Sequence, residues 1–319
     1  MIWRLEFENF ASCDAYIVQR IAQANKQLEP YQRKLNYKAV DIADPEPFKQ
    51  GHNLLVTHNW LAPGQLDPAR YEQFPSSYYA IYAGEAQTES QIPIKKFNCF
   101  SNRMDPIRQS WFYQLIRRGV FDQGYVSFNM DISRHIEMRQ YDPMVTAEQV
   151  FENQFKQYLE IFAPEHELAK KIVPYLNFTQ DLQKVIMQTE FSVVLETYFD
   201  NNQMITFSEK IFRCLKLPRP WLLFAMKNAV AHLRDIGFDV LDDLVNHDYD
   251  SVEFTIERQI MLLDQIELMC KKTLTTAQIA RCQQAADHNQ ALLDTMLKNF
   301  HNDVDKTCSR ALDKCKQLS

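Results

Sequence analysis

Short apolar segments alternate with amphipathic segments over the first two thirds of the chain. The apolar segments are rich in β-branched and aromatic residues, which favour strands. They span residues 53–58, 78–83, 93–100, 125–129, 191–199 and 220–224. The segments with helical periodicity span residues 107–118, 147–162, 180–188, 208–217 and 227–236. This alternation predicts βαβ units around a parallel sheet, and therefore an α/β fold class.

The pattern changes between about residues 131 and 178, where prolines interrupt charged helical segments and no strand pattern occurs. A chain of 319 residues is also longer than one hydrophobic core usually fills. We therefore expect two lobes, with this segment as the connection between them.

The last part of the chain, after Asp250, has a wholly helical pattern. From residue 279 onwards, apolar or small residues recur every three or four positions, interrupted on the same stripe by Asn289. The stripe consists of Ile279, Cys282, Ala286, Leu293, Met296, Phe300 and Val304. We expect one long helix, or two joined end to end, to pack back against the lobes. The alternative is a surface for a protein partner, because such a stripe can also form a coiled coil.

The composition argues against several classes of function. A net charge of −6 makes a nucleic acid an unsuitable partner, because phosphate binding relies on clustered Lys and Arg. No apolar stretch approaches the roughly 20 residues that span a membrane, and acidic residues interrupt the apolar start that a signal peptide needs. The seven cysteines are scattered without a CxxC pair, which favours reduced thiols over disulfides or a zinc site. We expect a cytoplasmic protein without a transmembrane segment.

The stretch FSEK, residues 207–210, is a candidate phosphate site. Ser208 is a good N-cap and Glu209 suits the first turn of a helix, and this explanation needs no ligand. The alternative is that the first-turn amides and Lys210 bind a diphosphate, while Glu209 accepts hydrogen bonds from a ribose or sugar hydroxyl. Glu196 ends the preceding apolar segment, and ligands of open α/β sheets bind at the carboxyl ends of strands. Glu196 and FSEK are therefore expected at one edge.

A series of motifs follows in a fixed order between Phe191 and Asp250. It consists of Glu196-Thr197, Ser208-Glu209-Lys210, Pro220 before an apolar strand, Gly237-Phe238 and Tyr249-Asp250. In order and spacing this segment resembles the donor-binding lobe of GT-B glycosyltransferases, especially the fucosyltransferase-like family and its bacterial and viral relatives. The resemblance implies two Rossmann-like lobes facing across a cleft, with a helical C-terminal extension. It assigns residues 1–130 to the acceptor lobe, 131–178 to a helical connection, 179–270 to the donor lobe and 271–319 to the extension.

A weaker similarity covers residues 98–129, where Asn102 and Arg103 end a strand and Arg108 lies on the next helix. The family resemblance implies that one or both arginines contact phosphate across the cleft, since a guanidinium matches phosphate oxygens. Without the resemblance both are solvated residues at a helix start. Two departures stand out: Ala225 follows the proline-led strand where relatives have a glycine, and Asn246-His247 replaces an acidic pair before Tyr249. A catalytically degenerate lobe remains an alternative.

The implied reaction is the transfer of a sugar, with inversion, from a nucleotide sugar to an acceptor hydroxyl. GDP-fucose is the most literal donor, and a glycan, a lipid-linked sugar and a protein are all open as acceptors. No metal or other cofactor is implied, since positive groups stabilise the leaving diphosphate. The implied donor-binding residues are Glu196, Ser208, Glu209, Lys210, Arg103, Arg108 and Tyr249. The general base is expected at a strand end of the N-terminal lobe, and Glu85 and His58 are the candidates, each with a purely structural alternative.

Two other functions stay open. The first is a non-catalytic binding protein built on a degenerate transferase fold, with its C-terminal helices as the surface for a partner. The second is an enzyme that processes nucleotide sugars or phosphosugars without transferring them.

Overall fold

The architecture is taken from a computed structural model. It describes residues 10–31, 34–38, 53–57, 60–61, 71–73, 93–101, 106–128, 185–196, 199, 204–205 and 207–317. The predicted strand at 78–83 and the predicted helix at 147–162 lie outside these residues, as does the predicted connection at 131–178.

The larger sheet has four parallel strands in the order β6-β5-β7-β9. These strands are β5 (Lys95–Ser101), β6 (Gly124–Phe128), β7 (Thr189–Leu195) and β9 (Trp221–Phe224). Cys99 of β5 pairs with Val126 on one side and Val193 on the other. The described part of the chain thus confirms an α/β fold with a parallel sheet, as the alternation of apolar and amphipathic segments predicts.

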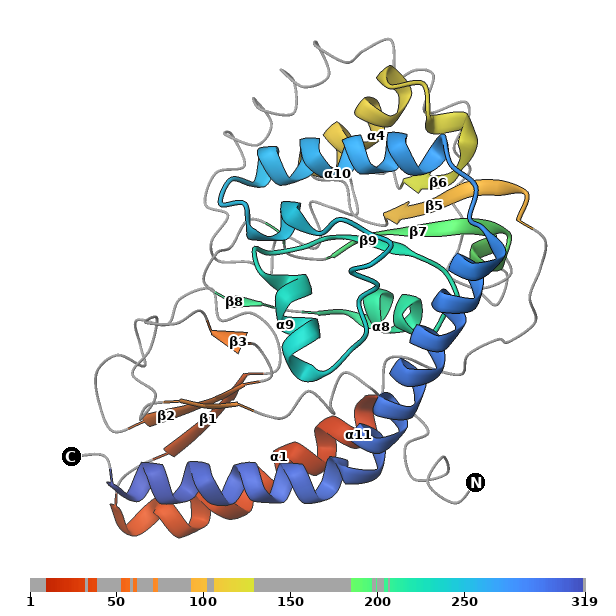
Figure 1. Cartoon of the computed structure of the whole chain (residues 1–319). Helices are drawn as coiled ribbons and strands as arrows, with labels where there is room; N and C mark the ends of the chain where they lie inside the picture. Colours follow the sequence, from red (N-terminus) through yellow and green to blue (C-terminus); the bar gives the residue numbers. More distant parts are fainter. Residues whose placement is uncertain are drawn as a thin grey trace.

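Helices cover both faces of this sheet, which explains why its central strands are continuous apolar runs. On one side lie α4 (Pro106–Arg117) and α10 (Thr255–Cys270), and on the other α8 (Glu209–Leu215) and α9 (Ala229–Ile236), as Figure 1 shows. Every residue of β9 is buried, and Trp111 of α4 meets Phe224 of β9 edge to face at 5.1 Å. Short 3₁₀ helices cover Glu29–Tyr31 (η1), Phe121–Gln123 (η4) and Asp248–Ser251 (η5).

A smaller parallel sheet, in the order β1-β2-β4, lies apart from the larger one. Its strands are β1 (Lys34–Lys38), β2 (Asn53–Thr57) and β4 (Tyr71–Gln73), and α1 (Phe10–Leu28) packs beside it. Of these elements the sequence predicts β2 alone. The two-residue strands β3 (Trp60–Leu61) and β8 (Met204–Ile205) form an antiparallel pair that joins distant parts of the chain.

The larger sheet crosses the predicted lobe boundary. Strands β5 and β6 belong to the range 1–130, yet β5 pairs along its length with β7 from the range 179–270. Local sequence determines that residues 95–101 form a strand, but the partner strand is decided by tertiary packing. In the described residues, the last strand of the smaller sheet ends at Gln73, and the first strand of the larger sheet begins at Lys95.

Helix α11 (Thr276–Gln317) is a single helix of 42 residues that runs from the larger sheet to the smaller one. It contacts α8 near its start and α1, β1, β2 and β4 further along. Most of the predicted apolar stripe is buried within the chain, including Cys282, Leu293, Phe300 and Val304 at 0–1% exposure, while Ile279 is 51% exposed. The prediction of one long C-terminal helix that packs back on the rest of the chain is therefore confirmed. Because these side chains are buried within the chain, most of the stripe is not available to form a coiled coil with a protein partner.

Candidate functional site

The order of the larger sheet reverses between β5 and β7. From β5 the chain continues to β6 on one side, and the later strands β7 and β9 are added on the other side. In open α/β sheets, ligands bind at such a reversal, outside the carboxyl ends of the strands. Here those ends are Ser101 of β5 and Leu195 of β7, so the predicted residues Arg103 and Glu196 both follow the strands that flank the reversal.

Glu196 and Ser208 meet at the start of α8. Ser208 is the N-cap, and its hydroxyl accepts a hydrogen bond from the Lys210 amide at 3.4 Å. The Ser208 amide in turn donates to the Glu196 carboxylate at 3.1 Å, and Glu196 is 1% exposed. The predicted proximity of Glu196 and the FSEK turn is present. The carboxylate of Glu196, together with that of Glu209 in the first turn, places negative charge at this helix start.

Two cations, one from α8 and one from α4, contact the backbone at the end of β7. The ammonium group of Lys210 donates to the Leu195 carbonyl at 3.1 Å, and the guanidinium of Arg108 donates to the carbonyl of Glu196. Arg108 is 3% exposed, and Glu209 is partly exposed in the first turn of α8. The structure thus brings together five of the predicted residues, from α4, the end of β7 and the start of α8.

The other predicted site residues are not part of this cluster. Arg103, His58 and Glu85 lie outside the described residues. Tyr249 is 2% exposed, its hydroxyl accepts a hydrogen bond from the Leu223 amide of β9 at 3.2 Å, and burial raises its pKa. Because its polar atom is used inside the chain, Tyr249 supports β9 and is not positioned as a ligand contact.

His247, one of the two departures from the family pattern, bonds to Tyr249. Its Nδ1 lies 3.0 Å from the Tyr249 hydroxyl and its Nε2 lies 2.9 Å from the Val240 carbonyl. A carbonyl only accepts, so Nε2 carries the proton and Nδ1 accepts from Tyr249. Burial lowers the pKa of His247, which agrees with this neutral form. His247, which stands at a position of the family's acidic pair, therefore helps to hold the 240–249 segment against β9.

The other departure concerns the missing glycine after β9. Asn228 adopts a left-handed conformation (φ 64°) between β9 and α9, which asparagine tolerates better than most residues. The turn that would suit a glycine is therefore formed without one. The Asp250 carboxylate then caps α9, accepting from the amides of Val230 at 3.0 Å and Ala231 at 2.9 Å.

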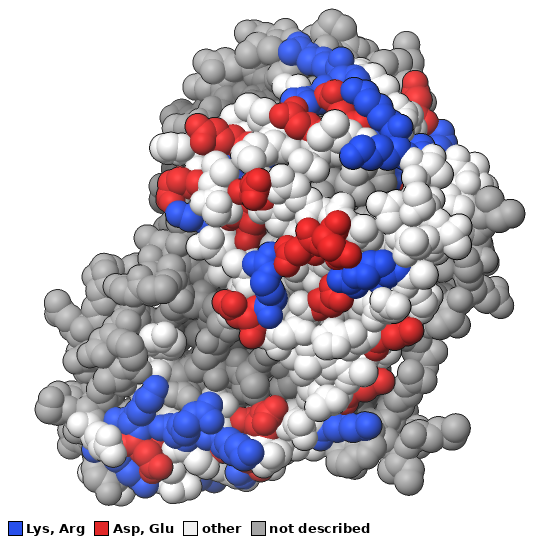
Figure 2. All heavy atoms as spheres, in the orientation of Figure 1, with Lys and Arg blue, Asp and Glu red and all other residues white. Residues whose placement is uncertain are grey.

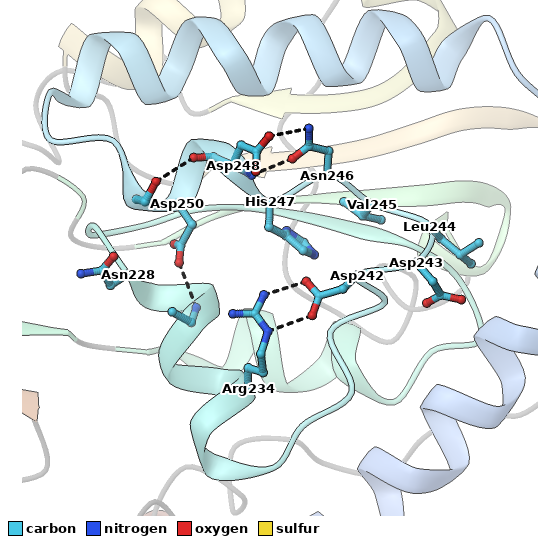
Figure 3. Close-up of a pocket in the computed structure, with 12 residues that line it drawn as sticks. Asn228, Arg234, Asp242, Asp243, Leu244, Val245, Asn246, His247, Asp248 and Asp250 are labelled. Carbon is cyan, nitrogen blue, oxygen red and sulfur yellow. Dashed lines mark hydrogen bonds and ion pairs between the residues drawn. The ribbon is translucent and has the colours of Figure 1, made fainter.

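A pocket of about 600 Å³ lies beside α9, between this helix and residues 242–251 (Figure 3). Arg234 forms a two-point ion pair with Asp242, at 2.8 and 2.6 Å, and Asp243, Asp248 and Asp250 also line the pocket. Acidic side chains gather in the same region of the face in Figure 2, near the middle of the molecule. Hydrogen-bond acceptors thus dominate the pocket, which suits hydroxyl or amine groups better than phosphate.

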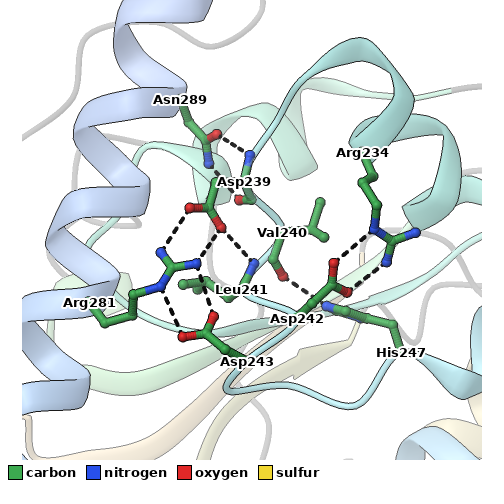
Figure 4. A network of polar contacts seen from close by, with 9 residues as sticks. All are labelled: Arg234, Asp239, Val240, Leu241, Asp242, Asp243, His247, Arg281 and Asn289. Atoms are coloured by element: carbon green, nitrogen blue, oxygen red, sulfur yellow. Dashed lines mark hydrogen bonds and ion pairs between the residues drawn. The ribbon is translucent and has the colours of Figure 1, made fainter.

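Next to the pocket, a polar network attaches α11 to the segment after α9 (Figure 4). Arg281 forms hydrogen-bonded ion pairs with Asp239 at 2.8 and 2.9 Å and with Asp243 at 2.9 Å. Asn289, which interrupts the apolar stripe, binds the backbone of Asp239 and the Leu215 carbonyl. These contacts fix the wall of the pocket to α11.

The unfolding free energy is expected to fall as the pH drops below about 6.5. Burial lowers the pKa of His247 and that of His232, the latter to about 4. Histidines of the unfolded chain titrate near 6.5, so below this pH the unfolded state binds more protons and gains stability relative to the folded state. Each histidine contributes a slope of at most about 1.4 kcal/mol per pH unit, and partial exposure of His232 reduces its share.

Urea unfolding between about pH 7 and pH 5 measures this dependence. His247→Gln and His232→Gln should each lose less stability over the interval than the wild type, because glutamine does not titrate. Identical pH dependence in all three chains would contradict the assignment.

The described residues contain no group of three His, Cys, Asp or Glu side chains close enough to hold a metal ion. Within them, too, no helix has the length and apolar character to cross a membrane. Six cysteines are buried free thiols in the described part of the chain: Cys99, Cys214, Cys270, Cys282, Cys308 and Cys315.

Comparison with protein-family models, with curated protein sequences and with solved structures found no match to this chain. The resemblance to GT-B glycosyltransferases therefore stays a prediction from the motifs between Phe191 and Asp250.

Proposed function

We propose that the chain is a glycosyltransferase that takes a sugar from a nucleotide-sugar donor and binds the donor diphosphate at the carboxyl edge of the larger sheet. The observation that carries the proposal is the convergence of Arg108, Lys210 and Glu196 where the strand order reverses. Two cations at this edge suit the charge that develops on a departing nucleoside diphosphate.

The two parallel sheets fit the same proposal. In it, the larger sheet belongs to the donor lobe, and the β1-β2-β4 sheet belongs to the acceptor lobe of a GT-B architecture. A base at a strand end of the acceptor lobe, Glu85 or His58, takes the proton of the acceptor hydroxyl. The donor is GDP-fucose or another nucleotide sugar, and no metal takes part.

Replacing Lys210 by Ala is expected to weaken nucleotide binding at least tenfold. A charge-assisted hydrogen bond contributes roughly 1.5–3 kcal/mol, which corresponds to a factor of about 10–150 in affinity. Calorimetric titration of the wild type and Lys210→Ala with GDP, UDP and their sugars provides the measurement.

The matched control is Lys96→Ala at the amino end of β5. Lys96 also bonds a carbonyl, that of Lys272 at 2.8 Å, and pairs with Glu190 at 2.8 Å, but it lies at the opposite edge of the sheet. We expect Lys96→Ala to lower stability and leave nucleotide affinity unchanged. A wild type that binds none of the nucleotides would refute the proposed donor site.

A second candidate function is a binding protein on a transferase fold that has lost activity. One observation favours it: the Glu196 carboxylate and the Lys210 ammonium both bond the chain's own backbone. This candidate predicts nucleotide binding without sugar transfer or hydrolysis. Product analysis with GDP-fucose and mixed glycan acceptors separates the two functions, since a transferred sugar appears in the first case alone.

A further inference from the structure

Three positively charged side chains from three helices hold the segment that follows β7. Lys210 of α8 donates to the Leu195 carbonyl at 3.1 Å, Arg108 of α4 to the carbonyl of Glu196, and Arg258 of α10 to the carbonyl of Phe199. Each of the three lies in the first turn of its helix. Each helix therefore contributes one cation to the carbonyls of Leu195, Glu196 and Phe199.

Phe199 is fixed on its ring as well as on its carbonyl. The guanidinium carbon of Arg108 lies 4.7 Å from the centroid of the Phe199 ring, which stacks on Phe224 at 5.0 Å. Arg258 also donates to the carbonyls of Val252 at 2.8 Å and Glu253 at 2.9 Å. Arg258 thus links Phe199 to Val252 and Glu253, which lie just before α10.

The position of these charges is unfavourable for the helices themselves. The first turn is the positive end of the helix dipole, where local preference places carboxylates and disfavours cations. Each of the three cations instead donates to a carbonyl of Leu195, Glu196 or Phe199, and the Glu196 carboxylate lies at the start of α8, so these helix starts are committed to holding the backbone after β7.

We infer that Arg258 is a positioning residue for the diphosphate of the donor. The inference rests on the proposed function. Arg258 is 2% exposed, so it acts through the Phe199 carbonyl and not by touching the ligand. Through this bond it fixes Phe199, on whose ring the Arg108 guanidinium packs, and so keeps Arg108 and the Glu196 carbonyl in the arrangement that receives the diphosphate.

The test compares Arg258→Met, which keeps the length of the side chain and removes its charge, with Arg118→Met. Arg118 is the matched control because it also links α10 to another part of the chain: it directly follows α4 and pairs with Asp264 and Glu267 of α10 at 2.6 Å, away from the carboxyl edge. Two quantities are measured: hydrogen exchange of peptides that span residues 191–199, and the Kd for the nucleotide that the wild type binds.

We expect Arg258→Met to raise amide exchange in this segment about tenfold and to weaken nucleotide binding about tenfold. Arg118→Met should change neither, even where it lowers the Tm. Arg258→Lys keeps the charge and serves if the methionine variant does not fold; it should give a smaller change in the same direction.

Unchanged exchange in the Arg258 variants, or raised exchange with unchanged nucleotide affinity, would overturn the inference while the proposed function stands. Equal effects from Arg118→Met would overturn it too, since they would reflect a general loss of stability. Absence of nucleotide binding by the wild type would instead reject the proposed function, and the positioning role would be rejected with it.

Discussion

A chain that ends at Thr275, and so lacks α11, is expected to lose cooperative unfolding. The helix buries Leu293, Phe300 and Val304 at 0–1% exposure. At roughly 1.5–3 kcal/mol each, these three side chains contribute about 5–9 kcal/mol, which is comparable with the whole stability of a typical domain. The smaller sheet also loses the helix that packs beside α1. The face of the smaller sheet that α11 covers would then be exposed to water.

Thermal unfolding followed by circular dichroism, together with gel filtration, measures the effect of the truncation. Ile279→Ala is the control within α11, because Ile279 is 51% exposed and its truncation should leave the Tm almost unchanged. A shortened chain that still melts cooperatively at the wild-type Tm would contradict the prediction. It would also revive α11 as a separable surface for a protein partner.

The elements of the larger sheet follow from its sequence because their signals are local. The run WLLF after Pro220 is apolar at every position, as a strand covered on both faces must be, and it forms β9. The β1 segment KLNYK and the β4 segment YEQ have no such run, and they become strands through pairing with β2. The pairing of β5 with β7 also depends on tertiary packing, so the sequence does not reveal it.

The candidate site also combines features that the sequence predicts with features that depend on tertiary packing. The N-cap at Ser208 and the approach of Glu196 follow from a capping residue and from strand direction, both of which are readable along the chain. The burial of Tyr249 and the contact of Arg258 with the Phe199 carbonyl depend on how η5 and α10 pack on the sheet. No signal in the sequence around Arg258 singles it out.

Replacing Asn289 by Leu is expected to destabilise the protein by about 3 kcal/mol, although it makes the apolar stripe of α11 continuous. Asn289 is 1% exposed; its oxygen accepts from the Asp239 amide at 2.8 Å, and its nitrogen donates to the carbonyls of Leu215 and Asp239, each at 3.0 Å. Leucine leaves these three buried or partly buried backbone groups without that partner, at a cost of up to about 1–3 kcal/mol each, partly offset by apolar burial.

Urea unfolding measures the loss, with Gln284→Leu as the control, since Gln284 is exposed on the same helix and should change stability by less than about 0.5 kcal/mol. Asn289→Asp should be at least as harmful as Asn289→Leu, because a carboxylate accepts from the Asp239 amide but repels the two carbonyl oxygens. If Asn289→Leu were as stable as the wild type, the hydrogen bonds of Asn289 would contribute nothing. Helix α11 would then be held by its apolar stripe together with its other polar contacts, such as the Arg281 ion pairs with Asp239 and Asp243.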